Sequence, residues 1–318
     1  MNEPTLPTPI RAAAPAIPLL LVLGPTAAGK SVLAARLAAK LGGEVVSADA
    51  LAVYRGLDIG TAKPGPDERA LAPHHLIDVT EPDQRSDLAR WLARAETAIA
   101  DIYARGRRVV VAGGSPLYTK ALVEGLSAGP PRDDVVRAAL MIRWDQQGGA
   151  ALFAELTRVD PAYAATRHAN DRLRVVRALE VFQLTGRPYS SFHTTDGVRR
   201  PEYAATLLGL HWDKVELHRR ITARVRAMFA AGLIDEVRAL RPRLCPEAAA
   251  GVGYKEVLGL LDGAYDAARA EELVVFATRH LAKHQLTWYR RWTDIHWLPG
   301  AAPDLVDQAL RVAGLCHR

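Results

Sequence analysis

The sequence has 318 residues, of which 49% are hydrophobic and 24% are charged, and it contains 24 Gly and 20 Pro. This length suggests about two domains of ~150 residues and can bury a large core, which excludes disordered, collagen-like and low-complexity classes. The apolar run 17–23 is too short to cross a bilayer, and the segment before it has Arg11 as its one basic residue, so we expect neither a membrane span nor a signal peptide.

The charge and the cysteines narrow the class further. The formal net charge is +6, from 41 Lys and Arg against 35 Asp and Glu, which permits an anionic partner such as a nucleic acid without requiring one. The two cysteines, Cys245 and Cys316, exclude a disulfide framework and a Cys-based zinc site. Such cysteine usage fits a reducing compartment, so we expect a cytoplasmic protein.

Apolar runs alternate with helical patterns over the first part of the chain. Residues 1–16 contain four prolines and no apolar period, which predicts a flexible tail. After it, the predicted strands are 17–23, 43–47 and 108–112, and the predicted helices are 31–41, 86–105 and 116–124. This order predicts an α/β fold, a parallel sheet flanked by helices. Together with the phosphate-binding motif at 24–31 described below, it predicts a sheet of the P-loop NTPase kind.

The composition changes at 127–132, SAGPPR, and the alternation stops there. From 133 to about 185 every segment is helical in pattern, and a turn-rich stretch closes at Pro201. Residues 204–212 then predict a strand that returns to the sheet, followed by helices at about 213–231, 253–261 and 266–292. We therefore expect a core domain of 17–128 and 201–318 that carries an inserted all-helical subdomain at 129–200.

The segment 24–31, GPTAAGKS, fits G-x-x-x-x-G-K-[ST] and stands between a predicted buried strand and a predicted helix. Glycines let successive backbone N–H groups turn toward phosphate oxygens, and the start of the helix adds positive potential. The residues expected to bind a phosphate or diphosphate are Gly24, Thr26, Ala27, Ala28, Gly29, Lys30 and Ser31. Lys30 would neutralise charge, and the Ser31 hydroxyl would hold Mg²⁺.

A carboxylate is expected beside this loop. P-loop ATPases and kinases usually place an acid at the end of a further apolar strand, but the strand 108–112 is followed by Gly113, Gly114 and Ser115. Asp49 follows the strand 43–47, and the carboxyl ends of parallel strands share one edge of the sheet. Asp49 is therefore a metal ligand, a general base or the N-cap of the segment after it.

Further cations are expected on the helix 213–231. Leu217, Ile221, Val225 and Met228 form its apolar stripe. At 100° per residue, Arg219 and Arg226 fall opposite this stripe, whereas Arg220 and Arg224 fall at its edge. We expect Arg220 and Arg224 to face the phosphate loop, and a surface ion pair is the alternative.

Two basic regions favour a nucleic acid. On the helix 266–292, the spacing predicts a buried face that includes Leu273, Ala277, Leu281, His284 and Trp288. Arg279, Lys283 and Arg290 fall on the other side as an exposed cationic strip, which suits a phosphate backbone or is a solvated charged face. The second region, 170–200, carries six arginines, among them Arg174 and Arg177.

The order of these motifs resembles that of the bacterial tRNA dimethylallyltransferases over roughly 18–298. The resemblance rests on 24–31, on SAD at 47–49, on VYRGLDIGTAKP at 53–64, on HHLID at 74–78 and on GGSPLY at 113–118. It continues with Asn170, Asp171, Arg174 and RALEV at 177–181, with GVGYKE at 251–256, and with Thr278, Arg279, Lys283, Gln285, Thr287 and Trp288.

The resemblance implies transfer of a dimethylallyl group from dimethylallyl diphosphate to the exocyclic N6 amine of the adenosine that is 3′-adjacent to the anticodon in tRNA. Asp49 would be the general base, and the phosphate loop, Mg²⁺, Arg220 and Arg224 would hold the diphosphate. It also implies a tRNA-binding role for the inserted subdomain. The residues that would contact the anticodon arm are Asp49, Ala50, Leu51, Ala52, Ser115, Arg137, Arg174, Arg177, Tyr254, Lys255, Arg279 and Lys283.

Two other readings remain open. The first is a P-loop kinase of small molecules, or a transferase that prenylates free adenine nucleotides, and neither needs the basic helix or the insertion. The second is a nucleotide-gated RNA-binding protein without chemistry, in which Asp49 is dispensable. We expect a monomer that contacts no membrane.

Overall fold

The computed structural model describes residues 16–126, 129–130, 132–192 and 197–315. The chain divides into two compact units, one formed by Met1–Val123 with Arg200–Arg318 and the other by Glu124–Arg199. The second unit begins at Glu124, the last residue of the helix Pro116–Glu124, which is five residues before the predicted start of the insertion. The predicted tail 1–16 lies outside the described residues, apart from Ala16.

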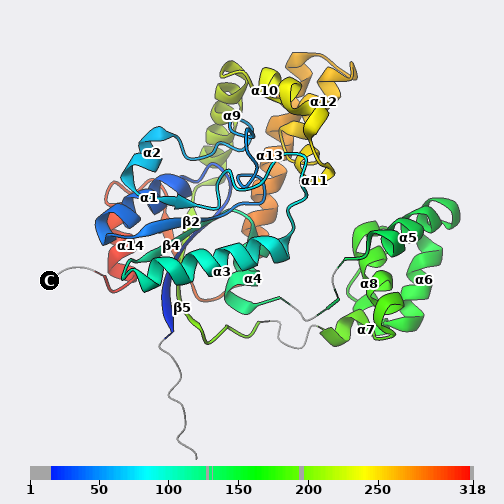
Figure 1. Cartoon of the computed structure of the whole chain (residues 1–318). Helices are drawn as coiled ribbons and strands as arrows, with labels where there is room; N and C mark the ends of the chain where they lie inside the picture. The colour runs from blue at the N-terminus through cyan, green and yellow to red at the C-terminus, as the bar shows by residue number, and fades with distance from the viewer. Residues whose placement is uncertain (1–15, 127–128, 131, 193–196, 316–318) are drawn as a thin grey trace, which may run out of the picture. The chain divides into compact units, whose positions relative to one another are not determined.

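A six-stranded sheet in the order β3-β2-β4-β1-β5-β6 forms the centre of the first unit, and all of its pairings are parallel (Figure 1). The strands are β1 (Ile17–Leu23), β2 (Glu44–Ala48), β3 (His74–His75), β4 (Val109–Gly113), β5 (Tyr203–His211) and β6 (Ile295–Pro299). The predicted parallel α/β fold is confirmed. The predictions for β1, β2, β4 and β5 agree to within a residue at each end. The strands β3 and β6 were not predicted, because β3 consists of two histidines and β6 ends in a proline, which is unfavourable in strands.

Helices cover both faces of this sheet. Side chains on successive residues of β1 point to opposite faces, so Leu20 and Val22 join one core and Leu19, Leu21 and Leu23 join the other. The first core is closed by α1 (Lys30–Leu41) and α14 (Leu305–Val312), and the second by α3 (Leu88–Ala104), α4 (Pro116–Glu124) and the helices that follow β5. The short α2 (Pro66–Leu71) follows the second strand and packs near α1.

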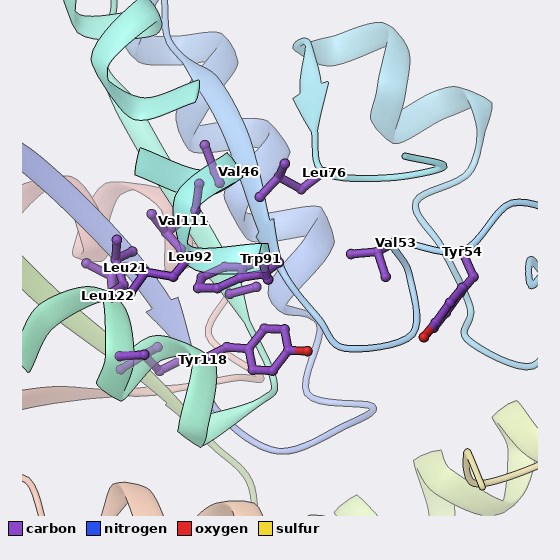
Figure 2. Close-up of a cluster of buried hydrophobic side chains, with 14 of the residues drawn as sticks. Leu21, Val46, Val53, Tyr54, Leu76, Trp91, Leu92, Val111, Tyr118 and Leu122 are labelled. Carbon is purple, nitrogen blue, oxygen red and sulfur yellow. The ribbon is translucent and has the colours of Figure 1, made fainter. Parts of the chain in front are cut away.

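The second core lies directly under the carboxyl end of β2. Figure 2 shows the rings of Trp91 and Tyr118 beside each other, and their centroids are 4.7 Å apart. The indole Nε1 of Trp91 donates a buried hydrogen bond of 3.0 Å to the carbonyl of Ser47. Because Ser47 is two residues before Asp49, this core fixes the strand end from which the candidate carboxylate projects.

The chain between β5 and β6 is helical and begins with α9, the helix that carries the four arginines. The elements are α9 (Lys214–Ala230), α10 (Leu233–Leu240), η2 (Arg241–Arg243), α11 (Pro246–Ala249), α12 (Tyr254–Leu261) and α13 (Ala267–Tyr289). As predicted, Leu217, Ile221 and Val225 are buried, and they pack against Val274 and Ala282 of α13.

The predicted orientation of α13 is wrong. Its buried residues are Ala270, Val274, Thr278, Ala282, Gln285 and Tyr289. Leu281 is 38% exposed, and His284, predicted to be a core residue, is exposed and hydrogen-bonded to His280 over 2.8 Å. The buried face of α13 includes two polar residues, Thr278 and Gln285, whose side chains make hydrogen bonds. The prediction was based on apolar residues alone, so it placed the buried face wrongly.

The second unit contains helices and no strand among its described residues. They are α5 (Asp134–Gln147), α6 (Gly149–Val159), α7 (Pro161–Ala164), α8 (Arg172–Thr185) and η1 (Tyr189–Phe192). A separate core fills this unit, with Leu140, Leu152, Leu156, Val175 and Leu179 completely buried. Every residue of this core belongs to 124–199, so the unit has its own apolar interior.

Candidate active site

The phosphate loop lies between β1 and α1, and Lys30 is the first residue of the helix. Gly24, Ala27 and Gly29 have φ values of 140°, 63° and 92°. Positive φ values favour glycine, and two of these three residues are glycines. At Gly24 a Cβ would also lie 2.9 Å from the carbonyl oxygen of Leu210. The loop thus curls at the start of α1, where unpaired N–H groups and the helix dipole attract an anion.

Two cavities of about 480 Å³ each adjoin this loop. The first contains Asp49 and has apolar walls that include Met228, Val252 and Leu281. The second is lined by cations of α9, among them Arg219 and Arg220. The two share Lys30, Ser31, Ala62, Lys63 and Arg224, so they meet at the phosphate loop.

Lys30 and Arg224 are the cations at this junction. The Lys30 ammonium donates a hydrogen bond of 2.7 Å to the carbonyl of Pro25. Burial, and after it the positive charge of Arg224, lower the pKa of Lys30 to about 7 against the opposing effect of the Asp49 carboxylate. Burial also lowers the pKa of Arg224. These two cations are therefore short of counter-charge, and a bound anion would supply it.

The helix-wheel prediction for α9 agrees with the structure. Arg220 Nε donates to the Ala27 carbonyl over 2.9 Å, and Arg224 Nη2 donates to the Thr61 carbonyl over 3.3 Å. On the other side, Arg219 and Arg226 have side chains that are 70% and 71% exposed and that pair with Glu216 and Glu271. Arg219 also borders the second cavity, but its guanidinium is bound to Glu216 by two hydrogen bonds of 2.7 Å.

Asp49 caps a turn and also faces the first cavity. Its Oδ1 accepts hydrogen bonds from the N–H groups of Leu51 at 2.8 Å and Ala52 at 3.1 Å. The segment that follows is a turn, so the helix N-cap considered from the sequence does not occur. Oδ2 makes no hydrogen bond within the described residues, which leaves it able to accept a proton. Ser115 lies close by, because its hydroxyl accepts from the Ala50 N–H at 3.3 Å.

Gln285 of α13 joins the phosphate loop to the end of β4. Its Oε1 accepts a 2.7 Å hydrogen bond from the Thr26 N–H, and its Nε2 donates a 2.6 Å bond to the Gly114 carbonyl. Sequence reasoning placed Gln285 in a motif but gave it no role. The available signal was a glutamine at helical spacing from apolar residues, since a buried amide needs partners for both of its ends.

A second unassigned residue, Glu236 of α10, holds the loop that forms a wall of both cavities. Its carboxylate accepts hydrogen bonds of 3.0, 2.7 and 3.1 Å from the N–H groups of Asp58, Ile59 and Gly60. The Tyr254 hydroxyl donates a fourth, of 2.6 Å. Tyr254 is completely buried, so its side chain is not exposed for the predicted contact with tRNA, whereas the neighbouring Lys255 is exposed.

The predicted tRNA-binding cations differ in how freely they are exposed. In the second unit, Arg137 and Arg177 both pair with the completely buried Glu180, at 2.7 and 3.0 Å, whereas the side chain of Arg174 is 56% exposed and pairs with Asp171. Lys283 on α13 and Arg290 directly after it are exposed, but Arg279 is half-buried and donates to the Thr222 hydroxyl at 3.0 Å. The predicted three-residue strip is therefore incomplete, because Arg279 packs against α9.

The donors available for a metal ion are few. No group of three or more His, Cys, Asp or Glu side chains that could hold a metal occurs among the described residues. Ser31 lines both cavities, and its hydroxyl makes no hydrogen bond within the described part of the chain. Mg²⁺ is commonly held by one or two protein oxygens together with substrate phosphates and water, so this sparse donor set fits a metal that arrives with a phosphate ligand.

Among the described helices, none has the length and apolarity needed to cross a membrane.

Fold and site together define a P-loop α/β protein in which Lys30, Arg224 and the Asp49 carboxylate meet at one edge of the sheet. A family model described as IPP transferase matches residues 52–292. The chain belongs to this family.

Relatives and a solved structure agree with this assignment. A tRNA dimethylallyltransferase of Stenotrophomonas maltophilia is 48% identical over 290 residues, which cover 87% of this chain and 91% of that protein. One of Anaeromyxobacter dehalogenans is 48% identical over 294 residues, which cover 92% and 97%. The crystal structure of the tRNA isopentenylpyrophosphate transferase of Bacillus halodurans aligns with a TM-score of 0.68 at 35% identity, over 93% of this chain and 94% of that one.

Proposed function

We propose that this protein transfers the dimethylallyl group of dimethylallyl diphosphate to the N6 amine of the adenosine 3′-adjacent to the anticodon of tRNA. The family membership supports tRNA prenylation. The observation that carries the site assignment is the placement of Asp49, Lys30, Ser31 and Arg224 around one cavity. A carboxylate beside an anion cradle is what an alkyl transfer with a diphosphate leaving group requires.

The reaction forms one bond and breaks one. The N6 lone pair attacks C1 of the dimethylallyl group, the C1–O bond breaks, and its electron pair leaves with the diphosphate. The amine is a poor nucleophile because its lone pair is delocalised into the ring, so removal of its proton must accompany attack. The unpaired Oδ2 of Asp49 would accept that proton.

The leaving diphosphate gains negative charge as the bond breaks. Lys30, Arg220, Arg224 and the N–H groups of the phosphate loop would stabilise this charge. The Ser31 hydroxyl would hold Mg²⁺, which when bound neutralises diphosphate charge. The apolar walls of the first cavity, with Met228, Val252 and Leu281, suit the dimethylallyl group and the adenine ring.

Recognition of tRNA is assigned to exposed cations. Arg174, Lys255 and Lys283 are available for phosphate contacts. Arg137 and Arg177 are partly exposed, at 22% and 24% of their side chains, so they would reach RNA only beside Glu180. The target base must leave its stack to reach the cavity, which costs little in a single-stranded loop. The site of action would be the cytoplasm, where tRNA is modified.

The test is mass spectrometry of nucleosides from tRNA incubated with the protein, dimethylallyl diphosphate and Mg²⁺. N6-dimethylallyladenosine at the position 3′ of the anticodon is the expected product. Parallel reactions replace tRNA with AMP, or dimethylallyl diphosphate with ATP. Prenylated AMP in the second reaction without modified tRNA in the first would contradict the proposal and favour the small-molecule alternatives. Consumption of ATP by a protein that prenylates no tRNA would do the same.

A further inference from the structure

Trp212 touches the phosphate loop and one of its arginines at the same time. It lies between β5 and α9 and is half-buried. Its indole Nε1 donates a 3.0 Å hydrogen bond to the carbonyl of Ala28, and its ring lies 4.0 Å from the guanidinium carbon of Arg220. Trp212 itself belongs to none of the sequence motifs that define the site, although both of its partners, Ala28 and Arg220, are predicted site residues.

The indole is itself held firmly. It packs in two of the apolar clusters of the first unit, with α1 on one side and α9 on the other. Gly300, after β6, contacts the indole so closely that a Cβ there would lie 2.1 Å from Nε1. Trp212 therefore has little freedom to change its rotamer, and the two groups that it contacts share that rigidity.

The contacts of Arg220 leave its outer nitrogens available. Its Nε donates to the Ala27 carbonyl at 2.9 Å, and its flat face stacks on the indole. Nη1 and Nη2 make no hydrogen bond within the described residues, and the Arg220 side chain lines the second cavity. Stacking on an aromatic face keeps the guanidinium charged and leaves its edge free to bind an anion.

We propose that Trp212 is a positioning residue, which fixes Arg220 and the phosphate-loop backbone at Ala28 in the arrangement that binds the leaving diphosphate. The inference rests on the proposed function for its kinetic consequence, but its binding consequence needs only an anion in the cradle. Holding an arginine in its bound geometry lowers the entropy lost when the diphosphate binds, and this gain would be greatest in the transition state.

The experiment uses the full chain with two substitutions. Trp212→Phe keeps an aromatic face and removes the N–H donor, whereas Trp212→Leu removes both. Single-turnover transfer should slow about 3- to 30-fold in Trp212→Leu, the range that a cation–π contact gives, and by less in Trp212→Phe. The affinity for inorganic diphosphate with Mg²⁺, measured by calorimetry, should fall in the same order, and the KM for tRNA should not change.

A double-substitution cycle separates positioning from general destabilisation. If Trp212 acts through Arg220, Trp212→Leu should add little to the defect of Arg220→Ala, yet should add its full defect to Arg224→Ala. Trp297→Leu, which alters a half-buried tryptophan on β6 that packs in a different apolar cluster from Trp212, is the control for a loss of packing.

The outcomes divide clearly. Equal losses from Trp212→Leu in the wild-type and Arg220→Ala backgrounds, or losses no larger than those of Trp297→Leu, would overturn the proposal. If the wild-type protein transferred no dimethylallyl group, the proposed function would fail, and the calorimetric cycle with inorganic diphosphate would still decide whether Trp212 positions Arg220.

Discussion

The backbone N–H of Arg200 donates a hydrogen bond of 2.8 Å to the carbonyl of Val123. These two residues are the points at which the chain leaves the first unit and returns to it. The apolar cluster around Leu156 contains only residues of the second unit, whereas three other apolar clusters contain only residues of the first unit. The second unit is therefore an insertion whose ends already meet.

This hydrogen bond predicts that the insertion can be removed. Replacing Glu124–Arg199 with a short Gly/Ser linker should leave a folded first unit that binds inorganic diphosphate, because its cores and its phosphate loop are intact. Binding of tRNA should weaken, and the slope of log K against log salt should flatten by roughly 0.7 to 0.9 for each RNA phosphate that the shortened protein no longer neutralises. Filter binding at several salt concentrations measures both quantities, and circular dichroism checks folding.

Arg174→Ala in the full chain provides the matched point substitution. Its side chain is exposed and pairs with Asp171, so its removal should weaken tRNA binding in the same direction but by less, with unchanged stability. Arg177→Ala is a poorer probe because it also removes one of the two arginines that pair with the buried Glu180. Unchanged affinity and salt slope in the folded deletion variant would mean that the insertion does not bind the RNA.

The sequence predicts local order well where one interaction dominates. The buried runs of β1 and β4 and the glycine-rich loop could be interpreted because continuous apolar strands and G-x-x-x-x-G-K-[ST] each have a single physical cause. The helical-wheel analysis of α9 also placed Arg220 and Arg224 on the side of the helix that faces the two cavities.

The orientation of α13, the burial of Tyr254 and the roles of Gln285 and Glu236 could not be predicted. Each depends on hydrogen bonds between residues far apart in the sequence, such as the contact of Gln285 with Thr26. Such bonds make polar residues compatible with burial, and periodicity alone does not reveal them.

Asp49→Asn should abolish transfer and leave diphosphate binding nearly unchanged. The amide oxygen can still accept from Leu51 and Ala52, so the turn is kept, but the amide cannot take a proton from N6. Loss of a general base costs about 10² to 10⁴ in rate. Single-turnover kinetics measures the loss, and Asp87→Asn, at the N-cap of α3, is the matched control that should remain fully active. Near-wild-type turnover in Asp49→Asn would refute the base assignment.

The arginines of α9 should divide into two pairs. Arg220→Ala and Arg224→Ala should each slow transfer by about 2 to 4 kcal/mol of transition-state stabilisation, because each removes a cation from the diphosphate cradle. Arg219→Ala and Arg226→Ala lie on the same helix, but their guanidinium groups pair with Glu216 and Glu271 at the surface, so transfer should hardly change. Similar single-turnover rates for all four variants would exclude a specific role for the first pair.

Gln285→Leu should destabilise the protein and weaken diphosphate binding together. The substitution leaves the Thr26 N–H and the Gly114 carbonyl without their partner, and each unsatisfied buried group costs about 1 to 3 kcal/mol. Urea unfolding and calorimetry with inorganic diphosphate measure the two effects. Gln308→Leu, which removes an exposed amide on α14, should change neither. Loss of stability with full diphosphate affinity would show that Gln285 holds the fold and not the loop.

Diphosphate binding should depend on the protonation of Lys30. Below pH 7 the ammonium is already charged and binding needs no additional proton. Above its pKa of about 7, the neutral amine must take up a proton as the anion binds, since a nearby anion raises the pKa. Affinity should therefore fall as the pH rises from about 7 to 9, by up to tenfold for each pH unit.

Calorimetry in buffers of different ionisation enthalpy counts the protons taken up at about pH 8. Lys30→Met is the reference, because the pH dependence that it retains belongs to diphosphate and to other groups. The difference between the two proteins should approach one proton.

The same group predicts the sign of a stability change: its pKa is lower in the folded protein than the usual 10.5, so the unfolded chain binds more protons between these values. The free energy of unfolding of the wild type, relative to Lys30→Met, should thus rise with pH above about 7. Equal proton uptake in the two proteins, or a relative stability that falls with pH, would mean that Lys30 stays charged in the unliganded cradle.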